Sequence, residues 1–442
     1  MIQVGQILFI LSVLVILHEF GHYITAKMFK VKVEKFYLFM DAGFSLVKKK
    51  IGDTEWGIGW LPLGGYVKLA GMVDESMDTE QLKQEPQPWE FRSKPAWQRL
   101  IIMLGGIIVN VLLAWLIYTV VYTTYGQKYI STEAIQKNGV AFGESGLNAG
   151  FKNGDKIVAV DGKFQERFNR MTLDLLLGDH VVVERNGKQE SFVLSDEAKK
   201  DILGGEGKDF IQPRLAIVQV DSVIPGMLAQ KAGVLKGDKI QGVNGSPITF
   251  QDELSTALGK YKNQDVTLNV LRNGTPIDLS SKVTEDGKIG VFNRTDISKD
   301  FQIVNKLSIG EAVSAAVDES YQLIVYNVKQ FKLILRPKTE AYKHVKSPIG
   351  IARALPDTWN WEFIWNFTAL FSIGLAFMNI LPIPGLDGGH ALFTIAEMIT
   401  GKKLSEKTMR YVQTTGMIIL LTLMALTFGK DIFELIVDKF VK

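Results

Sequence analysis

The stretch VLVILHEFGHYITAKMF, residues 13–29, places two histidines and a glutamate in a run of apolar residues that could cross a membrane. A charged residue near the centre of a spanning helix costs at least about 2.5–3.5 kcal/mol on insertion scales. Ionisable residues in such a segment therefore indicate a function. His18 and His22 are four residues apart, which on a helix puts both imidazoles on one face, about 6 Å apart along the axis.

This spacing suits two ligands of one tetrahedral zinc ion (Zn2+). Glu19 lies between the histidines in sequence and is turned to the side, where it can take a proton from water that the metal activates. The pattern is the His-Glu-x-x-His arrangement of metalloproteases. The alternative is that the three side chains snorkel at the helix end, just before Lys27.

The composition limits the possible chemistry and the class of protein. With 442 residues the chain exceeds the usual 100 to 200 per domain, so we expect several modules. Cysteine is absent, which excludes disulfides, thiol nucleophiles and cysteine zinc sites. The net charge of +3 comes without a polybasic tract, so no nucleic-acid partner is indicated. The mean hydropathy of +0.11 is positive although 22% of residues are charged, which predicts very apolar segments diluted by polar domains.

Four stretches approach the roughly 20 apolar residues that a spanning helix needs: about 4–24, 97–122, 363–383 and 412–428. The first lacks the basic start and the cleavage site of a secretory signal, so we expect it to be retained. The second contains LIIMLGGIIVNVLLAWLIYTVVY, residues 100–122, in which Asn110 is the only strongly polar residue. The alternative, helices buried in a soluble core, is disfavoured for the second and fourth stretches by their length and apolarity.

Basic residues beside the spans predict the orientation, because cytoplasmic flanks carry the excess of lysine and arginine. They follow span one, border span two and lie between spans three and four: Lys27, Lys30, Lys32, Lys35, Lys94, Arg99, Lys402, Lys403, Lys407 and Arg410. We therefore expect the loop between spans one and two and the loop between spans three and four in the cytoplasm. The long segment between spans two and three is expected outside.

That long segment contains a repeat, AGFKNGDKIVAVDGK at 149–163 and AGVLKGDKIQGVNGS at 232–246. Each copy predicts a turn, a short strand and a tight Asp-Gly or Asn-Gly hairpin. The pattern resembles PDZ domains, which accept an extended peptide as an added strand. The alternative is a pair of β-rich spacers. A helix with one apolar face follows and lies either on the membrane surface or against a neighbouring domain; its face comprises Val313, Val317, Tyr321, Ile324, Val328, Phe331 and Leu335.

A catalytic zinc site needs a third protein ligand. The third apolar stretch ends in FMNILPIPGLDGGHALF, residues 377–393, where Pro382 and Pro384 break a helix. Non-helical backbone at membrane depth is tolerated only where protein or a water-filled cavity surrounds it. A broken helix with a carboxylate at its tip would bring Asp387 to the zinc. The alternative is a cytosolic turn in which Asp387 caps the next helix.

The segments HEFGH, PLGGYVK and NILPIPGLDGGH, in this order around the duplicated modules, resemble the site-2 family of intramembrane zinc metalloproteases, specifically its RseP type. The resemblance covers essentially the whole chain. It implies zinc ligands His18, His22 and Asp387, with Glu19 as the catalytic base. It further implies that Asn379, Gly64, Gly65 and Tyr66 bind the substrate.

The resulting fold prediction is a polytopic α-helical membrane protein with four transmembrane helices, a membrane-associated β-hairpin region and two β-rich PDZ-like extracytoplasmic domains. The first expected domain, residues 1–125, holds two helices and the hairpin loop. The two PDZ-like domains follow at 126–208 and 209–295. An amphipathic connector at 296–360 leads to two further helices at 361–442.

The resemblance implies cleavage of peptide bonds in or near the transmembrane segment of single-span proteins, after their extracytoplasmic part has been trimmed. Anti-sigma factors and remnant signal peptides are the expected substrates. The expected location is the lipid bilayer of the bacterial inner membrane, with the active site near the cytoplasmic side.

Two other functions remain possible from the residues alone. One is a non-catalytic, membrane-anchored PDZ scaffold with a metal site, which would have no need of Glu19 beside paired histidines. The other is a metal transporter, which the scarcity of further polar residues in the spans argues against.

Overall fold

The computed structural model describes residues 2–62, 64–72, 85–205, 210–217, 219–293, 300–403 and 405–440. The chain divides into two compact units, which are described separately. The first unit comprises Met1–Gln127, Lys306–Phe331 and Val345–Lys442. The second comprises Lys128–Asn305 and Lys332–His344. The predicted domain boundaries at 208/209 and 295/296 fall outside the described residues.

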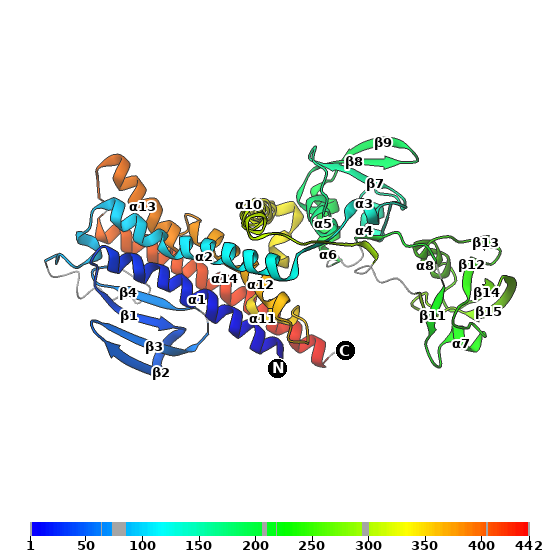
Figure 1. Ribbon diagram of the computed structural model, residues 1–442, viewed down its shortest axis with the longest axis horizontal. Coiled ribbons are helices and arrows are strands. Elements are labelled where there is room, and N and C mark those ends of the chain that lie inside the picture. The colour runs from blue at the N-terminus through cyan, green and yellow to red at the C-terminus, as the bar shows by residue number, and fades with distance from the viewer. Residues whose placement is uncertain are drawn as a thin grey trace. The chain divides into compact units, whose positions relative to one another are not determined.

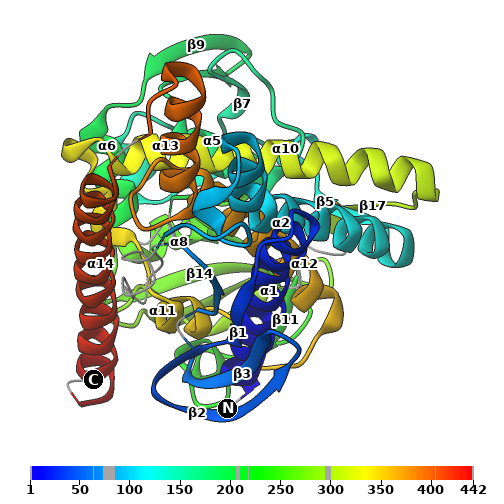
Figure 2. The same cartoon turned by 90° about the vertical axis from the view of Figure 1, so that its left-hand side faces the viewer.

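The first unit is built around long apolar helices (Figure 1). Within the described residues, four helices are long and apolar enough to cross a membrane: Ile2–Met28 (α1), Ala96–Tyr125 (α2), Trp361–Ile380 (α12) and Tyr411–Glu434. The last is part of α14, Glu406–Phe440. These helices confirm the four predicted apolar spans, with ends that differ by a few residues. Helix α2 packs against α1, α12 and the short α13, Asp387–Thr400, whereas Figure 2 shows α14 at the edge of the group.

Helices α1 and α2 approach each other closely through glycines. A Cβ atom added at Gly21 would lie 2.3 Å from the carbonyl oxygen of Gly105, and one added at Gly105 would lie 2.5 Å from that of Gly21. Neither position has room for a side chain. Small residues of this kind allow two membrane helices to pack backbone against backbone. The close crossing holds the His-Glu-x-x-His segment of α1 against the middle of α2.

The unit also contains most of α10, Ile309–Ile334, and the short α11, Pro348–Arg353. The predicted amphipathic helix is therefore present as α10. It packs on α2 and α12 through Ala312 and Ala316, which are fully buried. Most of its predicted apolar face is exposed instead: Val313, Val317, Tyr321, Ile324 and Val328. Helix α10 therefore packs on neighbouring helices through its small residues, and contact of its exposed apolar face with the membrane surface stays a prediction.

A four-stranded sheet follows α1, formed by Val33–Leu38 (β1), Met40–Ile51 (β2), Thr54–Leu61 (β3) and Tyr66–Leu69 (β4). Its strand order is β2-β3-β1-β4. The pairs β2–β3 and β1–β4 are antiparallel, but β1 and β3 are parallel. The sequence predicted strands joined as hairpins and did not predict this parallel pair, because side-chain alternation identifies strands and not their partners. Strand β4 is an edge strand that packs against α1.

The prolines end α12 as predicted. Its last residue is Ile380, and Leu381 is already extended. The chain then turns through the segment that contains Pro382 and Pro384, with Gly385 at a φ of +93°. Helix α13 starts at Asp387. The aspartate is therefore the first residue of a new helix, next to the broken end of an apolar one.

The second unit contains two β-rich modules. The first runs through Gln127–Ile130 (β5), Thr132–Ile135 (α3), Val140–Phe142 (β6), Glu144–Asn148 (α4), Lys156–Val160 (β7), Phe168–Leu177 (α5), His180–Arg185 (β8), Lys188–Val193 (β9), Asp196–Gly204 (α6) and Ile211–Pro213 (β10). The second runs through Val220–Val223 (β11), Leu228–Lys231 (α7), Lys239–Val243 (β12), Ser246–Pro247 (β13), Gln251–Gly259 (α8), Asp265–Arg272 (β14), Thr275–Lys282 (β15) and Val291–Asn293 (β16). Strand Gln302–Asn305 (β17) comes later in the chain and pairs with β5 of the first module.

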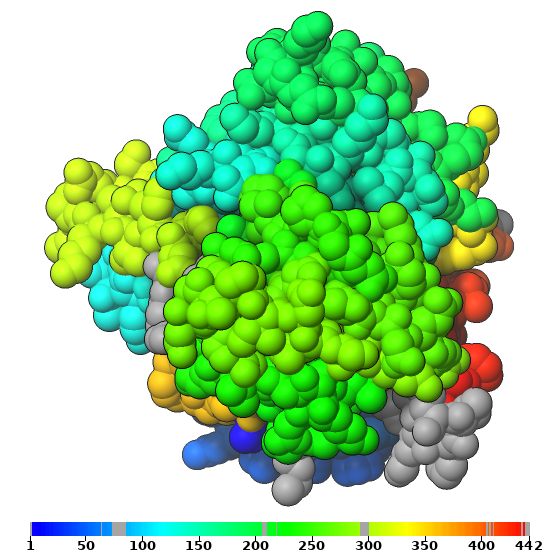
Figure 3. Space-filling model, turned by 90° about the vertical axis from the view of Figure 1, so that its right-hand side faces the viewer, coloured from blue at the N-terminus to red at the C-terminus, as the bar shows by residue number. Residues whose placement is uncertain are grey.

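Each module has its own sheet and its own core. The sheets are β7-β8-β9 in the first module and β13-β12-β14-β15 in the second, whose surface lies in front in Figure 3. Three two-stranded pairs, β6–β10, β11–β16 and β5–β17, complete the unit. Separate clusters of buried apolar residues fill the two modules.

The repeated Gly-Asp sequence has the same local structure in both modules. Arg185 donates to Asp155 at 2.7 Å and to the carbonyl of Gly150 at 3.1 Å. Arg272 donates to Asp238 at 2.8 Å and to the carbonyl of Gly233 at 2.7 Å. Each aspartate also accepts from the backbone N–H three residues before it. The repeat in the sequence therefore corresponds to a repeated ion pair that fastens the loop before β7 or β12.

Candidate metal centre and active site

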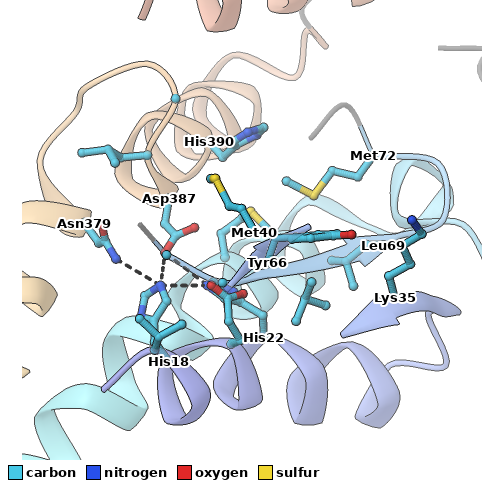
Figure 4. A pocket seen from close by; sticks show the side chains of 18 of the residues that line it. His18, His22, Lys35, Met40, Tyr66, Leu69, Met72, Asn379, Asp387 and His390 are labelled. Carbon is cyan, nitrogen blue, oxygen red and sulfur yellow. Dashed lines mark hydrogen bonds and ion pairs between the residues drawn. The ribbon is translucent and has the colours of Figure 1, made fainter. Parts of the chain in front are cut away.

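The three predicted ligands come together in the first unit. The Nε2 atoms of His18 and His22 lie 3.4 Å apart, and Oδ2 of Asp387 lies 3.2 Å from each of them (Figure 4). Among the described residues this is the group of His, Asp and Glu side chains whose ligand atoms could hold one metal ion. The sequence separation between Asp387 and the histidines is 365 residues or more.

The geometry fits zinc. Bonds of about 2.0–2.1 Å in a tetrahedron place the ligand atoms about 3.3 Å apart, close to the observed spacings. Three protein ligands leave the fourth position for water or substrate, as catalytic zinc sites require. The other ring nitrogen of His22, Nδ1, lies 2.9 Å from the carbonyl oxygen of Ile102. It can donate its proton there, which leaves Nε2 unprotonated for the metal.

The glycines of α2 make this arrangement possible. A Cβ atom at Gly106 would lie 2.5 Å from Nε2 of His22 and 2.7 Å from Nδ1 of His18. No side chain fits there without displacing a ligand ring. The sequence thus places two predicted ligands by helical spacing on α1, packs them against glycines of α2 and brings the third predicted ligand on the first turn of α13.

Glu19 lies beside this group, next to the start of β4. Its carboxylate accepts a hydrogen bond from the backbone N–H of Val67. Gly65 allows this approach, because a Cβ atom there would lie 2.6 Å from Val15 and 3.3 Å from Glu19. The outer edge of β4 therefore faces the proposed base.

A cavity of about 490 Å³ contains the whole group (Figure 4). All predicted site residues line it: His18, Glu19, His22, Gly64, Gly65, Tyr66, Asn379 and Asp387. Asn379, near the end of α12, places its amide nitrogen 3.0 Å from Nε2 of His18. The structure thus brings together every predicted residue.

The cavity also has walls that sequence reasoning missed: Met40, Asp41, Met72, His390, Gln413 and Met417. Gln413 of α14 lies 2.7 Å from Nε2 of His390, so the fourth apolar helix closes one side. Tyr66 donates to Asp41 at 3.0 Å. Burial, together with this carboxylate, raises the pKa of Tyr66 and keeps its hydroxyl protonated. Gln413, a polar residue in the predicted fourth apolar stretch, was the signal that could have placed α14 at the cavity.

Comparison with known proteins agrees with the geometry. The model of the family "Peptidase family M50" matches residues 6–423. A protein of Neisseria meningitidis serogroup A named "Putative zinc metalloprotease NMA0084" is 28% identical, over 97% of this chain and 98% of its own length. The "Regulator of sigma-E protease RseP" of Escherichia coli is 28% identical, over 96% of this chain and 97% of its own. The "Regulator of sigma E protease" of Haemophilus influenzae is 26% identical, over 98% and 99%.

Proposed function

We propose that this chain, which belongs to peptidase family M50 and is a zinc metalloprotease, hydrolyses peptide bonds within or near the transmembrane segment of single-span membrane proteins. One observation carries the proposal. The zinc ligands His18 and His22 lie on a helix long and apolar enough to span a membrane, and His22 is about 9 Å of helix from its end. Membership in a protease family sets aside the scaffold and the metal transporter.

The residues divide the chemistry among them. Bound zinc supplies a Lewis acid, which lowers the pKa of water to about 7 and polarises a carbonyl group. Glu19 takes the proton of the attacking water and passes it to the leaving amine. Asn379 presents its amide N–H beside the ligand cluster, where it can donate to the carbonyl oxygen or to the backbone of the substrate.

The edge of β4 is the proposed place for the substrate backbone. A transmembrane helix hides its amides in its own hydrogen bonds, so it must unwind locally before it is cleaved. Among the described strands β4 pairs only with β1, and its other edge faces Glu19. Gly64 and Gly65 lead into it without side chains. A substrate segment added to this edge gains new backbone partners at the point of cleavage.

The sequence and the relatives support a proposal for the role of the second unit, for the substrates and for the location of the protein. We take both modules of the second unit as PDZ-like, extracytoplasmic filters that admit only substrates whose outer domain is already trimmed. Anti-sigma factors are the first candidate substrates, since two relatives carry the names "Regulator of sigma E protease" and "Regulator of sigma-E protease RseP". Remnant signal peptides are the second. The lysines after α1 support a bacterial inner-membrane location with the active site near the cytoplasmic side.

The test compares the purified full chain with its Glu19→Gln variant for bound zinc and for cleavage of a single-span model substrate. We expect the variant to keep its zinc and to lose cleavage by about 10²- to 10⁴-fold, the usual contribution of a general base. Glu434→Gln, at a half-exposed position near the end of α14, is the matched control. Cleavage that survives in Glu19→Gln would refute the mechanism. A wild type that binds no zinc would refute the site.

A further inference from the structure

Asn110 is a polar residue in the middle of the apolar helix α2 that the mechanism above does not use. It is completely buried, at 0% exposure. Its side-chain nitrogen lies 3.1 Å from Nδ1 of His18. Its side-chain oxygen has no hydrogen-bond partner among the described residues. An amide at membrane depth with one unpaired end is costly, so its contact with a proposed zinc ligand calls for an explanation.

The contact has a definite consequence for the tautomer of His18. Its Nε2 atom faces His22 and Asp387 and is therefore the nitrogen that binds metal. A nitrogen that binds metal carries no proton, so the ring proton must sit on Nδ1. Nδ1–H then needs a hydrogen-bond acceptor. In this buried place the terminal amide of Asn110 is the group within hydrogen-bond distance of it.

An asparagine can supply that acceptor without a change in the space that its side chain occupies. The oxygen and nitrogen of the amide are nearly equal in size, and a half-turn about the last side-chain bond exchanges them. The half-turn places Oδ1 against Nδ1–H of His18, and it also pairs the oxygen that is otherwise left without a donor. The rotation thus gives Nδ1–H of His18 an acceptor and gives Oδ1 of Asn110 a donor.

We propose that Asn110 is a positioning residue, whose amide oxygen accepts the hydrogen bond of His18 Nδ1–H and so holds Nε2 towards the zinc. The inference rests on the proposed zinc site. It makes the two histidines equivalent, because Nδ1 of His22 is held by the carbonyl of Ile102 in the same way. Both supports come from α2. Groups that orient metal-ligating histidines in this manner typically contribute about 10- to 100-fold to metal affinity.

The position of α2 itself does not depend on the Asn110 side chain. Ser372 of α12 donates to the main-chain oxygen of Asn110 at 2.7 Å, a bond that any residue at position 110 can accept. Leucine has nearly the shape of asparagine and suits an apolar helix. Asn110→Leu therefore removes the acceptor and keeps the bond from Ser372, whereas Asn110→Asp keeps an acceptor.

The experiment measures zinc affinity by chelator competition on the purified full chain, for wild type, Asn110→Leu and Asn110→Asp. The control is Thr368→Val, which alters a fully buried polar residue of α12; within the part of the chain that the structure describes, its hydroxyl donates to the carbonyl of Ile364 in its own helix. We expect Asn110→Leu to weaken zinc binding by about 10- to 100-fold and to change the visible spectrum of the cobalt-loaded protein. Asn110→Asp should bind within about threefold of wild type or more tightly.

The outcomes separate this inference from the function on which it rests. Zinc binding by Asn110→Leu as tight as in wild type, with an unchanged cobalt spectrum, would overturn the role of Asn110 and leave the protease proposal standing. Equal losses in Asn110→Leu and Asn110→Asp would overturn it too, because they would point to packing. A wild type that binds no zinc would overturn the zinc site and this inference together.

Discussion

Replacing Gly106 by alanine should disable the metal centre with a single methyl group. The added Cβ would lie 2.5 Å from Nε2 of His22 and 2.6 Å from Cε1 of His18. Ordinary contacts begin at 3.4 Å, so the rings or the helices must separate by about 0.9 Å. Overpacking of this kind costs about 1–3 kcal/mol of stability. A misplacement near 1 Å costs catalysis about 10²-fold.

The assay for Gly106→Ala is zinc affinity and cleavage of a single-span model substrate by the purified full chain. We expect both to fall, with cleavage reduced about 100-fold or more. Gly374→Ala is the control, because Gly374 also lies in an apolar helix but a Cβ atom there meets no atom within 4 Å among the described residues. If Gly106→Ala binds zinc and cleaves like Gly374→Ala, the close packing of α2 on the two histidines is wrong.

Two further predictions concern a ligand and an ion pair. Asp387→Ala should lose zinc while the chain still inserts into membranes, because Asp387 lies outside the apolar helices; unchanged zinc content would show that the third ligand is a different residue. In the second module, Arg272 holds the pKa of Asp238 below its usual range. The stabilisation is therefore complete above the unfolded pKa of about 3.9 and is lost as pH falls through the lower folded value. Hydrogen exchange of the backbone amides in β12 and β14 should therefore accelerate in that acid range. The variant Asp238→Asn should lose this pH dependence, and its second module should be less stable at pH 7 by about 1–3 kcal/mol. If exchange in the variant depends on pH as it does in the wild type, the assignment of the ion pair is wrong.

Local patterns in the sequence were sufficient for much of the fold and of the site. The four-residue spacing of His18 and His22 fixes their common face on any helix, and two prolines after a long helical run end that helix. Both features depend on neighbouring residues alone. The same holds for the repeated Gly-Asp turns, whose hairpins were predicted from their glycines.

Other features depend on contacts between distant segments and could not be predicted. The parallel pairing of β1 with β3 is one, since alternation does not specify a partner. The closure of the cavity by Gln413 is another. Asn110 was visible in the sequence as a polar exception, but its partner, 92 residues away, depends on how α1 crosses α2.

The ionisable residues of α1 are tolerated in an apolar helix because each of them contacts a polar group on an element other than α1. His22 meets the carbonyl of Ile102 and His18 meets Asn110, both on α2, whereas both rings meet Asp387 on α13. Glu19 meets the backbone of β4. No single element completes the site, so the cost of burying these groups is offset only when α1, α2, α13 and β4 are assembled together.

This shared assembly implies energetic coupling between variants on α2. Gly106 sets how closely the helix approaches the histidines, and Asn110 acts only at that approach. Once Gly106→Ala has moved α2 away from the histidines, removal of the acceptor at Asn110 should reduce zinc affinity by little more. The double variant should therefore bind zinc more tightly than the product of the two single losses predicts, with a coupling of about 0.5–3 kcal/mol, as for residues that share one partner.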